Sequence, residues 1–174
     1  MSKIACFKAY DIRGVVPSEL NVDLAYNIAR GYKKFTGCKS IVIGRDIRKS
    51  SEELSTALVN GFLDCGVDVI DIGLCGTEMV YFGTSYLNAD GGIMITASHN
   101  PPEYNGMKFV RERSIPISYD SGLNTIEEII GNAGFDPLPT TKGNYSQRDI
   151  SDEFVVHLGT FYDLNKMKKM KVVV

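Results

Sequence analysis

The chain has 174 residues, of which 44% are hydrophobic and 23% are charged, and its formal net charge is −2. This length allows one sizeable core with the beginning of a second domain, and the composition is that of a globular protein. No apolar run reaches the roughly 20 residues that span a bilayer, no signal peptide is recognisable and the basic residues are scattered, so we expect a cytoplasmic protein without membrane or nucleic-acid partners.

Strand-like and helix-like segments alternate along the first two thirds of the sequence. Apolar or alternating runs predict strands at residues 7–14, 40–44, 67–73 and 92–96. Apolar residues at helical spacing predict helices at residues 21–36, 50–65, 77–87 and 121–130. The residues expected to cap or stop these helices are Asn21, Gly37, Ser50 with Glu53 as a capping box, Gly66 and Thr77.

Successive strand–helix units imply parallel strands, whereas residues 107–110 follow the strand at 92–96 too closely for a crossover and should return antiparallel. We therefore expect an α/β fold with a mixed, mostly parallel sheet and helices on both faces. Sheets of this kind place function at the carboxyl ends of their strands. The turn Gly44–Arg48 and the segment that begins at Thr96 both leave such ends.

The segment Thr96–Lys108 reads Thr-Ala-Ser-His-Asn-Pro-Pro-Glu-Tyr-Asn-Gly-Met-Lys. Its adjacent prolines restrict the backbone and its Asn-Gly pair permits a turn with positive φ, so we expect a rigid loop. The loop offers a hydroxyl, an imidazole, two amides and an ammonium, which together can hold an anion beside a nucleophile. These groups belong to Ser98, His99, Asn100, Asn105 and Lys108. The alternative is a hairpin connection whose serine forms only a turn hydrogen bond.

The last third of the chain differs in composition. Residues 132–150 are rich in glycine, proline and polar residues and read as a linker between a first domain at 1–131 and the start of a second at 151–174. Ser151 is expected to cap a helix, on which His157 has no evident partner and should be exposed or merely packed. Lys171–Val174 has the composition of a strand cut off inside its run. The four widely spaced cysteines predict reduced thiols, with neither disulfides nor a zinc site.

Several motifs, in order along the chain, resemble those of one enzyme family. The Thr96–Lys108 string resembles the phosphoserine loop of the α-D-phosphohexomutases, the phosphomannomutase and phosphoglucomutase superfamily. Tyr10-Asp-Ile-Arg-Gly is similar to the N-terminal signature of that family, and Gly44–Arg48 and Gly76-Thr77 resemble two further motifs. We interpret Gly44–Arg48 as mainly structural, an ion-paired turn. The resemblance covers essentially the entire chain.

The resemblance implies an intramolecular phosphotransferase of the isomerase class, in which Ser98 carries a phosphoryl group that it exchanges with a phosphorylated hexose. It also implies that phosphorylated Ser98 gives one oxygen to Mg²⁺, that Lys108 or Arg13 assists proton transfer, and that a hexose 1,6-bisphosphate is the activator. The implied catalytic residues are Ser98, Lys108, Arg13 and His99, and the implied substrate-binding residues are Tyr10 and Asn100.

The Asp-Gly-Asp-x-Asp-Arg metal loop of that family and its distal phosphate-binding domain are absent from this sequence. Asp90-Gly91-Gly92 cannot replace the metal loop, because one carboxylate does not supply the oxygen ligands that Mg²⁺ demands. The chain thus resembles domain 1 and the start of domain 2 of a four-domain enzyme. We expect it to be inactive without the remaining domains.

Tyr104 and the Gly-Thr-Glu at 76–78 resemble bacterial phosphomannomutases that serve GDP-mannose synthesis. This predicts interconversion of mannose 6-phosphate and mannose 1-phosphate. Two alternatives are a phosphoglucomutase of the same family and a non-catalytic α/β module that binds a phosphorylated ligand. In the encoding DNA, a stop codon directly after Val174 would favour the module, and an in-frame continuation would favour the mutase. A Rossmann dinucleotide enzyme is excluded, because no strand is followed by Gly-x-Gly-x-x-Gly.

Overall fold

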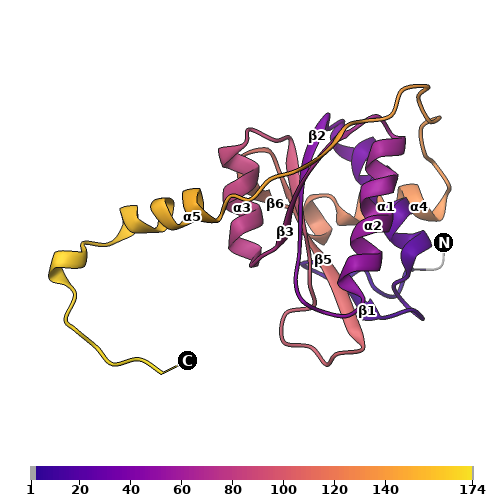
Figure 1. The fold of residues 1–174 in the computed structure, drawn as a ribbon. Coiled ribbons are helices and arrows are strands. Elements are labelled where there is room, and N and C mark those ends of the chain that lie inside the picture. Colours follow the sequence, from indigo (N-terminus) through magenta and orange to yellow (C-terminus); the bar gives the residue numbers. More distant parts are fainter. Residues whose placement is uncertain (1–2, 174) are drawn as a thin grey trace.

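The computed structural model describes residues 3–173, and within this range a seven-stranded sheet runs through the middle of the molecule (Figure 1). The strands are β1 (Ile12–Val15), β2 (Ser40–Arg45), β3 (Asp68–Leu74), β4 (Gly91–Ile95), β5 (Tyr104–Arg111), β6 (Ile115–Pro116) and β7 (Tyr145–Gln147). The α-helices are α1 (Val22–Thr36), α2 (Ser51–Asp64), α3 (Thr77–Tyr86), α4 (Leu123–Gly131) and α5 (Ser151–Leu158). Short 3₁₀ turns lie at Glu112–Ser114, Tyr119–Ser121, Gly159–Phe161 and Leu164–Lys166.

The strand order is β1-β5-β4-β2-β3-β7, with β6 beside β5. Strand β2 is parallel to β3 and β4, and β3 is parallel to β7. Strand β5 is antiparallel to β1, β4 and β6, so it runs against all the other described strands. This confirms the expected mixed, mostly parallel sheet. The chain leaves β2 through α2 for β3 on one side and returns through α3 to β4 on the other. The gap between the carboxyl ends of β2 and β4 is therefore a topological switch point, where α/β folds bind ligands.

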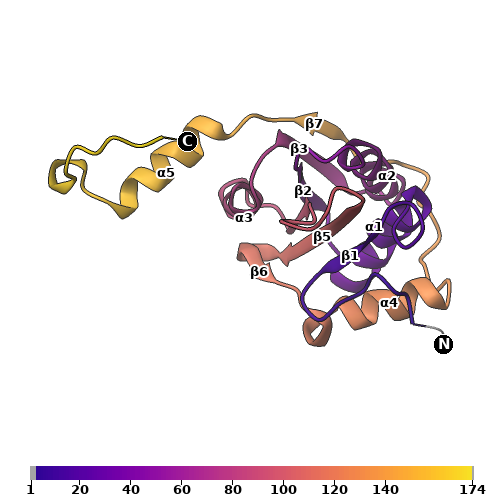
Figure 2. The same ribbon diagram turned by 90° about the horizontal axis from the view of Figure 1, so that it is seen from below.

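Helices cover both faces of the sheet, as Figure 2 shows, with α1, α2 and α4 on one face and α3 on the other. The larger core lies on the first face, where Ile28, Phe62 and Ile126 meet the sheet side chains. The smaller core lies under α3 and includes Val80 and Ile150. Strand β2 faces both cores, which is why its apolar run is continuous.

Helix α1 forms as the sequence predicts, whereas the starts of the other helices differ. The side chain of Asn21 accepts the Leu24 N–H at 2.9 Å, and Gly37 ends the helix with φ of 72°. Ser50 is the N-cap residue of α2, but its side chain makes no capping hydrogen bond, and its hydroxyl accepts one from Asn105. The other caps lie one or two residues earlier than expected. Gly76 replaces Thr77, and the Asp149 carboxylate accepts the Ser151 N–H at 2.9 Å.

Two backbone predictions in the first domain are wrong. The strand expected at 7–14 is reduced to β1, because Lys8 N–H bonds to Asp11 C=O at 2.9 Å and closes a turn. Neither Asn105 nor Gly106 has positive φ, since both lie in β5. Gly106 is needed there for a different reason. A Cβ atom at this position would lie 2.2 Å from the carbonyl oxygen of Ile12 on the neighbouring strand.

The segment after α4 contains a strand that the sequence analysis missed, because β7 pairs with β3 at the edge of the sheet. Beyond it, α5 and the residues that follow project from the body as an arm (Figure 1). His157 is exposed and stacks on Phe82 with ring centroids 4.9 Å apart, as a packed histidine would. Lys171–Val173 form no strand, and Val174 lies outside the described residues.

All four cysteines are free, and Cys6 and Cys38 are buried. In the described part of the chain, no helix is long and apolar enough to cross a membrane.

Candidate functional site

The candidate site lies at the switch point between β2 and β4. The loop 96–103 leaves the carboxyl end of β4, and the turn 46–50 leaves that of β2, as the sequence predicts. The two segments are joined directly, because the Asp46 N–H donates to the Ile95 carbonyl oxygen at 3.0 Å. The sheet pairing thus extends past both strands and sets the loop beside the turn.

The loop consists of two consecutive tight turns. Asn100 N–H bonds to Ala97 C=O at 3.0 Å, and Tyr104 N–H bonds to Pro101 C=O at 3.0 Å. Within the first turn Ser98 has φ of 54°, a conformation that non-glycine residues rarely adopt. The Ser98 N–H is held by the Thr96 hydroxyl at 2.9 Å. Such a conformation persists only where the surroundings fix it, and it is a recurrent feature of functional sites.

Arg48 provides most of the surrounding contacts. Its Nη1 donates to the carbonyl oxygens of Pro101 and Tyr104 at 2.8 and 3.0 Å. Its Nη2 donates to those of Ser98 and Asn100 at 2.8 and 2.6 Å. The Arg48 Nε lies 3.4 Å from an Asp46 carboxylate oxygen, as expected for an ion-paired turn. One guanidinium therefore fastens four carbonyl groups of the loop.

The Ser98 hydroxyl is exposed at the tip of this loop. In the described part of the chain its one hydrogen bond is to Nδ1 of the neighbouring His99, at 3.3 Å. A serine that only closes a turn would be bonded to the backbone of its own loop. The Ser98 side chain is not bonded in that way, which leaves its oxygen accessible to another molecule.

Two cations lie next to the loop and share one carboxylate. Asp11, only 6% exposed, accepts Arg13 Nη2 at 2.6 Å and Lys108 Nζ at 3.2 Å on the same oxygen. Arg13 Nη1 also donates to the Asn100 side-chain oxygen at 3.3 Å. The structure thus brings Arg13, Lys108 and Asn100 together through hydrogen bonds, and Asn100 connects them to the Ser98 loop.

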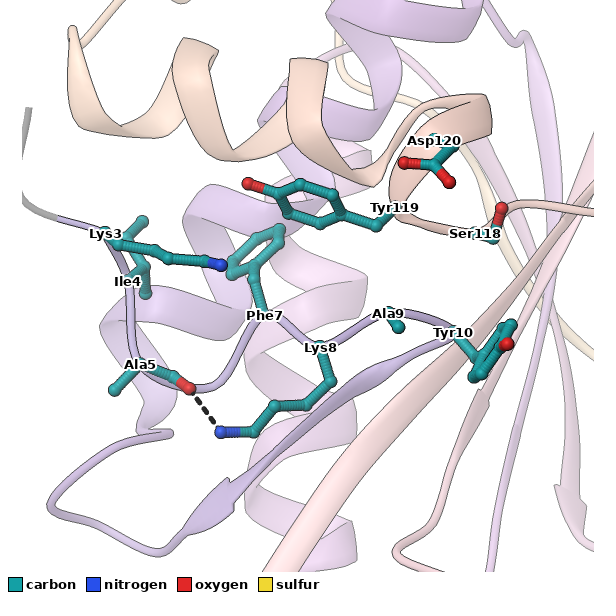
Figure 3. Close-up of a pocket in the computed structure, with 10 residues that line it drawn as sticks. All are labelled: Lys3, Ile4, Ala5, Phe7, Lys8, Ala9, Tyr10, Ser118, Tyr119 and Asp120. Carbon is teal, nitrogen blue, oxygen red and sulfur yellow. Dashed lines mark hydrogen bonds between the residues drawn. The ribbon is translucent and has the colours of Figure 1, made fainter.

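Tyr10 has no hydrogen bond to this group in the described residues. It is 81% exposed and lines a separate hollow of about 580 Å³ between the N-terminal segment and the turn at Tyr119 (Figure 3). In that hollow Lys8 Nζ donates to the Ala5 carbonyl oxygen at 2.6 Å. The expected substrate-binding role of Tyr10 therefore stays a prediction.

A hollow of about 660 Å³ adjoins Ser98. It is bounded by the turn after β2, the start of α3 and the loop, and its lining includes Arg48, Thr77, Ser98 and Asn100. Cys75 also lines it, but burial raises the pKa of that thiol to about 11. At neutral pH the thiol is protonated and a poor nucleophile, whereas Ser98 is open to solvent.

The residues of this chain do not by themselves fit a magnesium ion. In residues 3–173 no three histidine, cysteine, aspartate or glutamate side chains are grouped closely enough to hold a metal. Mg²⁺ demands near-octahedral oxygen ligands, and Asp11 is already occupied by two cations.

Comparisons with known proteins agree with the motifs. Residues 5–136 match the family "Phosphoglucomutase/phosphomannomutase, alpha/beta/alpha domain I". The chain is 48% identical to a phosphomannomutase from Escherichia coli K12, covering all of this chain and 38% of that protein. It is 50% identical to a phosphomannomutase from Klebsiella pneumoniae, over 89% of this chain and 99% of that protein.

A crystal structure of a phosphoglucomutase/phosphomannomutase family protein from Burkholderia thailandensis superposes with a TM-score of 0.78 at 37% identity, covering 89% of this chain and 35% of that one. The chain belongs to the phosphoglucomutase/phosphomannomutase family, and the resemblance drawn from its motifs is confirmed. It spans about 38% of the length of the E. coli relative.

The sequence analysis missed two contributors to this site. Asp11 was not singled out, although a carboxylate two residues before Arg13 on an extended segment lies on the same side of the chain. Arg48 was assigned to its turn alone, because its four carbonyl partners are separated from it by about fifty residues or more.

Asn105 was expected to shape a turn but is buried and donates to the hydroxyls of Ser50 and Ser51.

Proposed function

We propose that this chain is the phosphoserine-bearing part of a phosphohexomutase that interconverts mannose 6-phosphate and mannose 1-phosphate in the cytoplasm, acting with further domains. The observation that carries the proposal is the exposed Ser98 hydroxyl at the carboxyl end of β4, in a loop whose Asn100 binds Arg13, the cation that shares Asp11 with Lys108. The names of the similar proteins support mannose as the substrate, and phosphoglucomutase activity is the alternative within the family.

The proposed chemistry is two phosphoryl transfers. In the first, the bond between the phosphorus and Oγ of phosphorylated Ser98 breaks as a hydroxyl oxygen of the sugar phosphate bonds to that phosphorus. The sugar hydroxyl gives up its proton, and Ser98 Oγ takes one up and becomes a hydroxyl again. A hexose 1,6-bisphosphate results. After this intermediate turns around, its other phosphoryl group returns to Ser98 Oγ, and the freed sugar oxygen takes up a proton. Such transfers depend mainly on positioning and on cations that stabilise the equatorial oxygens.

The side chains around Ser98 suit these requirements. The Arg13 guanidinium can hold two phosphate oxygens, and the Lys108 ammonium adds a second positive charge. Lys108 is the better candidate to exchange a proton with the sugar hydroxyl, because a guanidinium does not release its proton in proteins. His99 and Asn100 line the reacting phosphate. We propose that Mg²⁺ contacts this chain only through the phosphate on Ser98, and that a hexose 1,6-bisphosphate loads Ser98.

The test follows the phosphate itself. The product of the complete reading frame that carries this chain is incubated with glucose 1,6-bisphosphate and Mg²⁺, and intact mass and peptide mapping locate any added phosphate. We expect one phosphate on Ser98. Ser98→Ala should keep its fold, because the change removes little volume, but mutase activity in a coupled assay should fall by several powers of ten. Wild-type activity in that variant, or phosphate on another residue, would refute the proposal.

Two controls separate the alternatives. Mannose and glucose phosphates are assayed side by side, and a higher kcat/KM for glucose would make the protein a phosphoglucomutase. Binding of a hexose phosphate without turnover or phosphorylation would instead make it a non-catalytic module. The 174-residue chain alone is expected to turn over far more slowly than the roughly 1 per second of ordinary enzymes.

A further inference from the structure

Arg48 lies against the candidate loop, and its side chain is 13% exposed. A short chain of polar contacts connects it to the start of α2. The Ser51 hydroxyl donates to one Asp46 oxygen at 2.6 Å, and the other Asp46 oxygen lies 3.4 Å from Arg48 Nε. The same Asp46 oxygen that accepts from Ser51 also accepts the Arg48 N–H at 3.0 Å. Both the backbone and the guanidinium of Arg48 are therefore fixed before it reaches the loop.

The four carbonyl groups that Arg48 binds belong to peptides with limited alternatives. The peptides that follow Asn100 and Pro101 end in prolines and have no N–H, so they can hold this part of the loop only through their carbonyl oxygens. The Pro101 carbonyl accepts the Tyr104 N–H at 3.0 Å as well as Arg48. No other side chain can offer four donors in one plane, and a lysine ammonium offers three from a single atom. The Pro-Pro pair makes the loop rigid but does not attach it to the sheet. Arg48 provides this attachment through its hydrogen bonds to the loop carbonyls.

The contact with Arg48 also fixes the orientation of the peptide that joins Ser98 to His99. Its carbonyl oxygen is held by Arg48 at 2.8 Å, and because a trans peptide is planar its N–H points the opposite way. The His99 N–H forms no hydrogen bond within residues 3–173. It is therefore directed away from Arg48 and left available to an anion on the exposed side of the loop.

We propose that Arg48 is a positioning residue for phosphoryl transfer: by binding four loop carbonyls it holds Ser98 at positive φ, and it orients the His99 N–H toward the side from which a phosphate group is bound. The positive φ of Ser98 is unfavourable by itself, so the loop needs a partner that compensates for it. This role rests on the proposed function of Ser98, but whether Arg48 holds the loop can be tested without measuring catalysis.

The first experiment uses hydrogen–deuterium exchange on the 174-residue chain. Arg48→Met removes all donors, Arg48→Lys keeps the charge, and Arg45→Met is the matched control. Arg45 ends the same strand, but its ion-pair partner is Asp71 and not the loop. In both Arg48 variants we expect peptides covering 97–104 to exchange at least tenfold faster, while α1 stays protected as in the wild type. Unchanged loop protection in Arg48→Lys overturns the proposal, whether or not Arg48→Met folds.

The second experiment measures catalysis in the product of the complete reading frame. In Arg48→Ala the Ser98 hydroxyl should no longer be held in position. Both kcat and the rate of Ser98 phosphorylation by glucose 1,6-bisphosphate should therefore fall about a hundredfold, with KM changed little. Guanidinium chloride, well below denaturing concentrations, should partly restore kcat in Arg48→Ala. A rise in KM at constant kcat would overturn the positioning role. If wild-type Ser98 takes up no phosphate, the proposed function fails, and the exchange experiment still decides how the loop is held.

Discussion

Asp11 binds both cations near the Ser98 loop. Its buried carboxylate is the shared partner of Arg13 on β1 and Lys108 on β5, two strands that pair with each other. A single oxygen accepts both cations, so neither side chain can move without weakening its bond to Asp11. The negative charge also offsets one of the two positive charges, which leaves a net attraction for a phosphate group near Asn100.

In the product of the complete reading frame, we predict that Asp11→Asn lowers kcat by about tenfold to a hundredfold, because Arg13 and Lys108 lose the carboxylate that positions them. Stability should fall by about 1.5–3 kcal/mol, the range for a lost hydrogen bond to a charged group. Coupled activity assays and urea unfolding measure the two effects. The control is Asp120→Asn, since Asp120 is exposed and has no ion-pair partner in the described structure. Equal losses in both variants would contradict the assigned role.

At the scale of single elements, the close pairing of β1 and β5 depends on Gly106. Its position faces Arg13 across the two strands, and the backbone oxygens of Ile12 and Thr96 lie where a side chain would begin. Strand β5 also carries Lys108, so a separation of these strands would move one cation away from the other.

Gly106→Ala should therefore lower the free energy of unfolding by about 2–3 kcal/mol, the upper range for overpacking, because rigid backbone cannot yield as a side chain would. Gly134→Ala is the control, because its nearest neighbour would be 3.6 Å away, and its effect should stay within about 0.5 kcal/mol. Thermal and urea unfolding of the two variants measure the difference. A neutral Gly106→Ala would show that the two strands are not constrained as described.

Elements whose determinants are local were predictable from the sequence. Helix α1 is the clearest case, since its cap, its apolar periodicity and its terminal glycine all lie within residues 21–37. Ser50 has the same local signature, yet Asn105 binds its hydroxyl from 55 positions away in the sequence. Strand β7 is short, polar and exposed, so no alternation marks it, and it exists because β3 offers an open edge.

The same distinction applies to the site. Ser98, Arg13 and Lys108 could be proposed as site residues because the motifs that contain them are contiguous, and the chain belongs to the family that these motifs resemble. The four-carbonyl contact of Arg48 and the shared carboxylate of Asp11 arise only when distant segments meet. Sequence reasoning had no signal for the first and a weak one, the spacing from Arg13, for the second.

Considered as a whole, the molecule has a well-packed body and an arm with exposed apolar side chains. The arm residues with more than half of their surface exposed are Val155, Val156, Phe161, Tyr162, Met167, Met170, Val172 and Val173. Apolar surface of this extent favours contact with another surface. We therefore expect the 174-residue chain to self-associate as its concentration rises.

Size-exclusion chromatography across a concentration series tests this expectation, with earlier elution at higher concentration as the predicted result. Val156→Lys combined with Phe161→Lys should shift the chain back toward the monomer, because these two side chains are 72% and 70% exposed and contribute little to the core. The matched control is Ile47→Lys, an 84% exposed side chain in the body, which should leave the elution unchanged. A monomer at every concentration would contradict the prediction.

The path of residues 132–150 along the body limits how freely the arm can swing. A disordered tether of that length would let its ends wander over roughly 25 Å. Here, Gly143 N–H bonds to Leu63 C=O, Arg148 N–H bonds to Asp71 C=O, and Ile150 is fully buried. Phe154 then packs on Phe82, with ring centroids 5.5 Å apart. These contacts therefore continue into the start of α5. A partner that binds the arm would then bind it in one fixed orientation relative to Ser98.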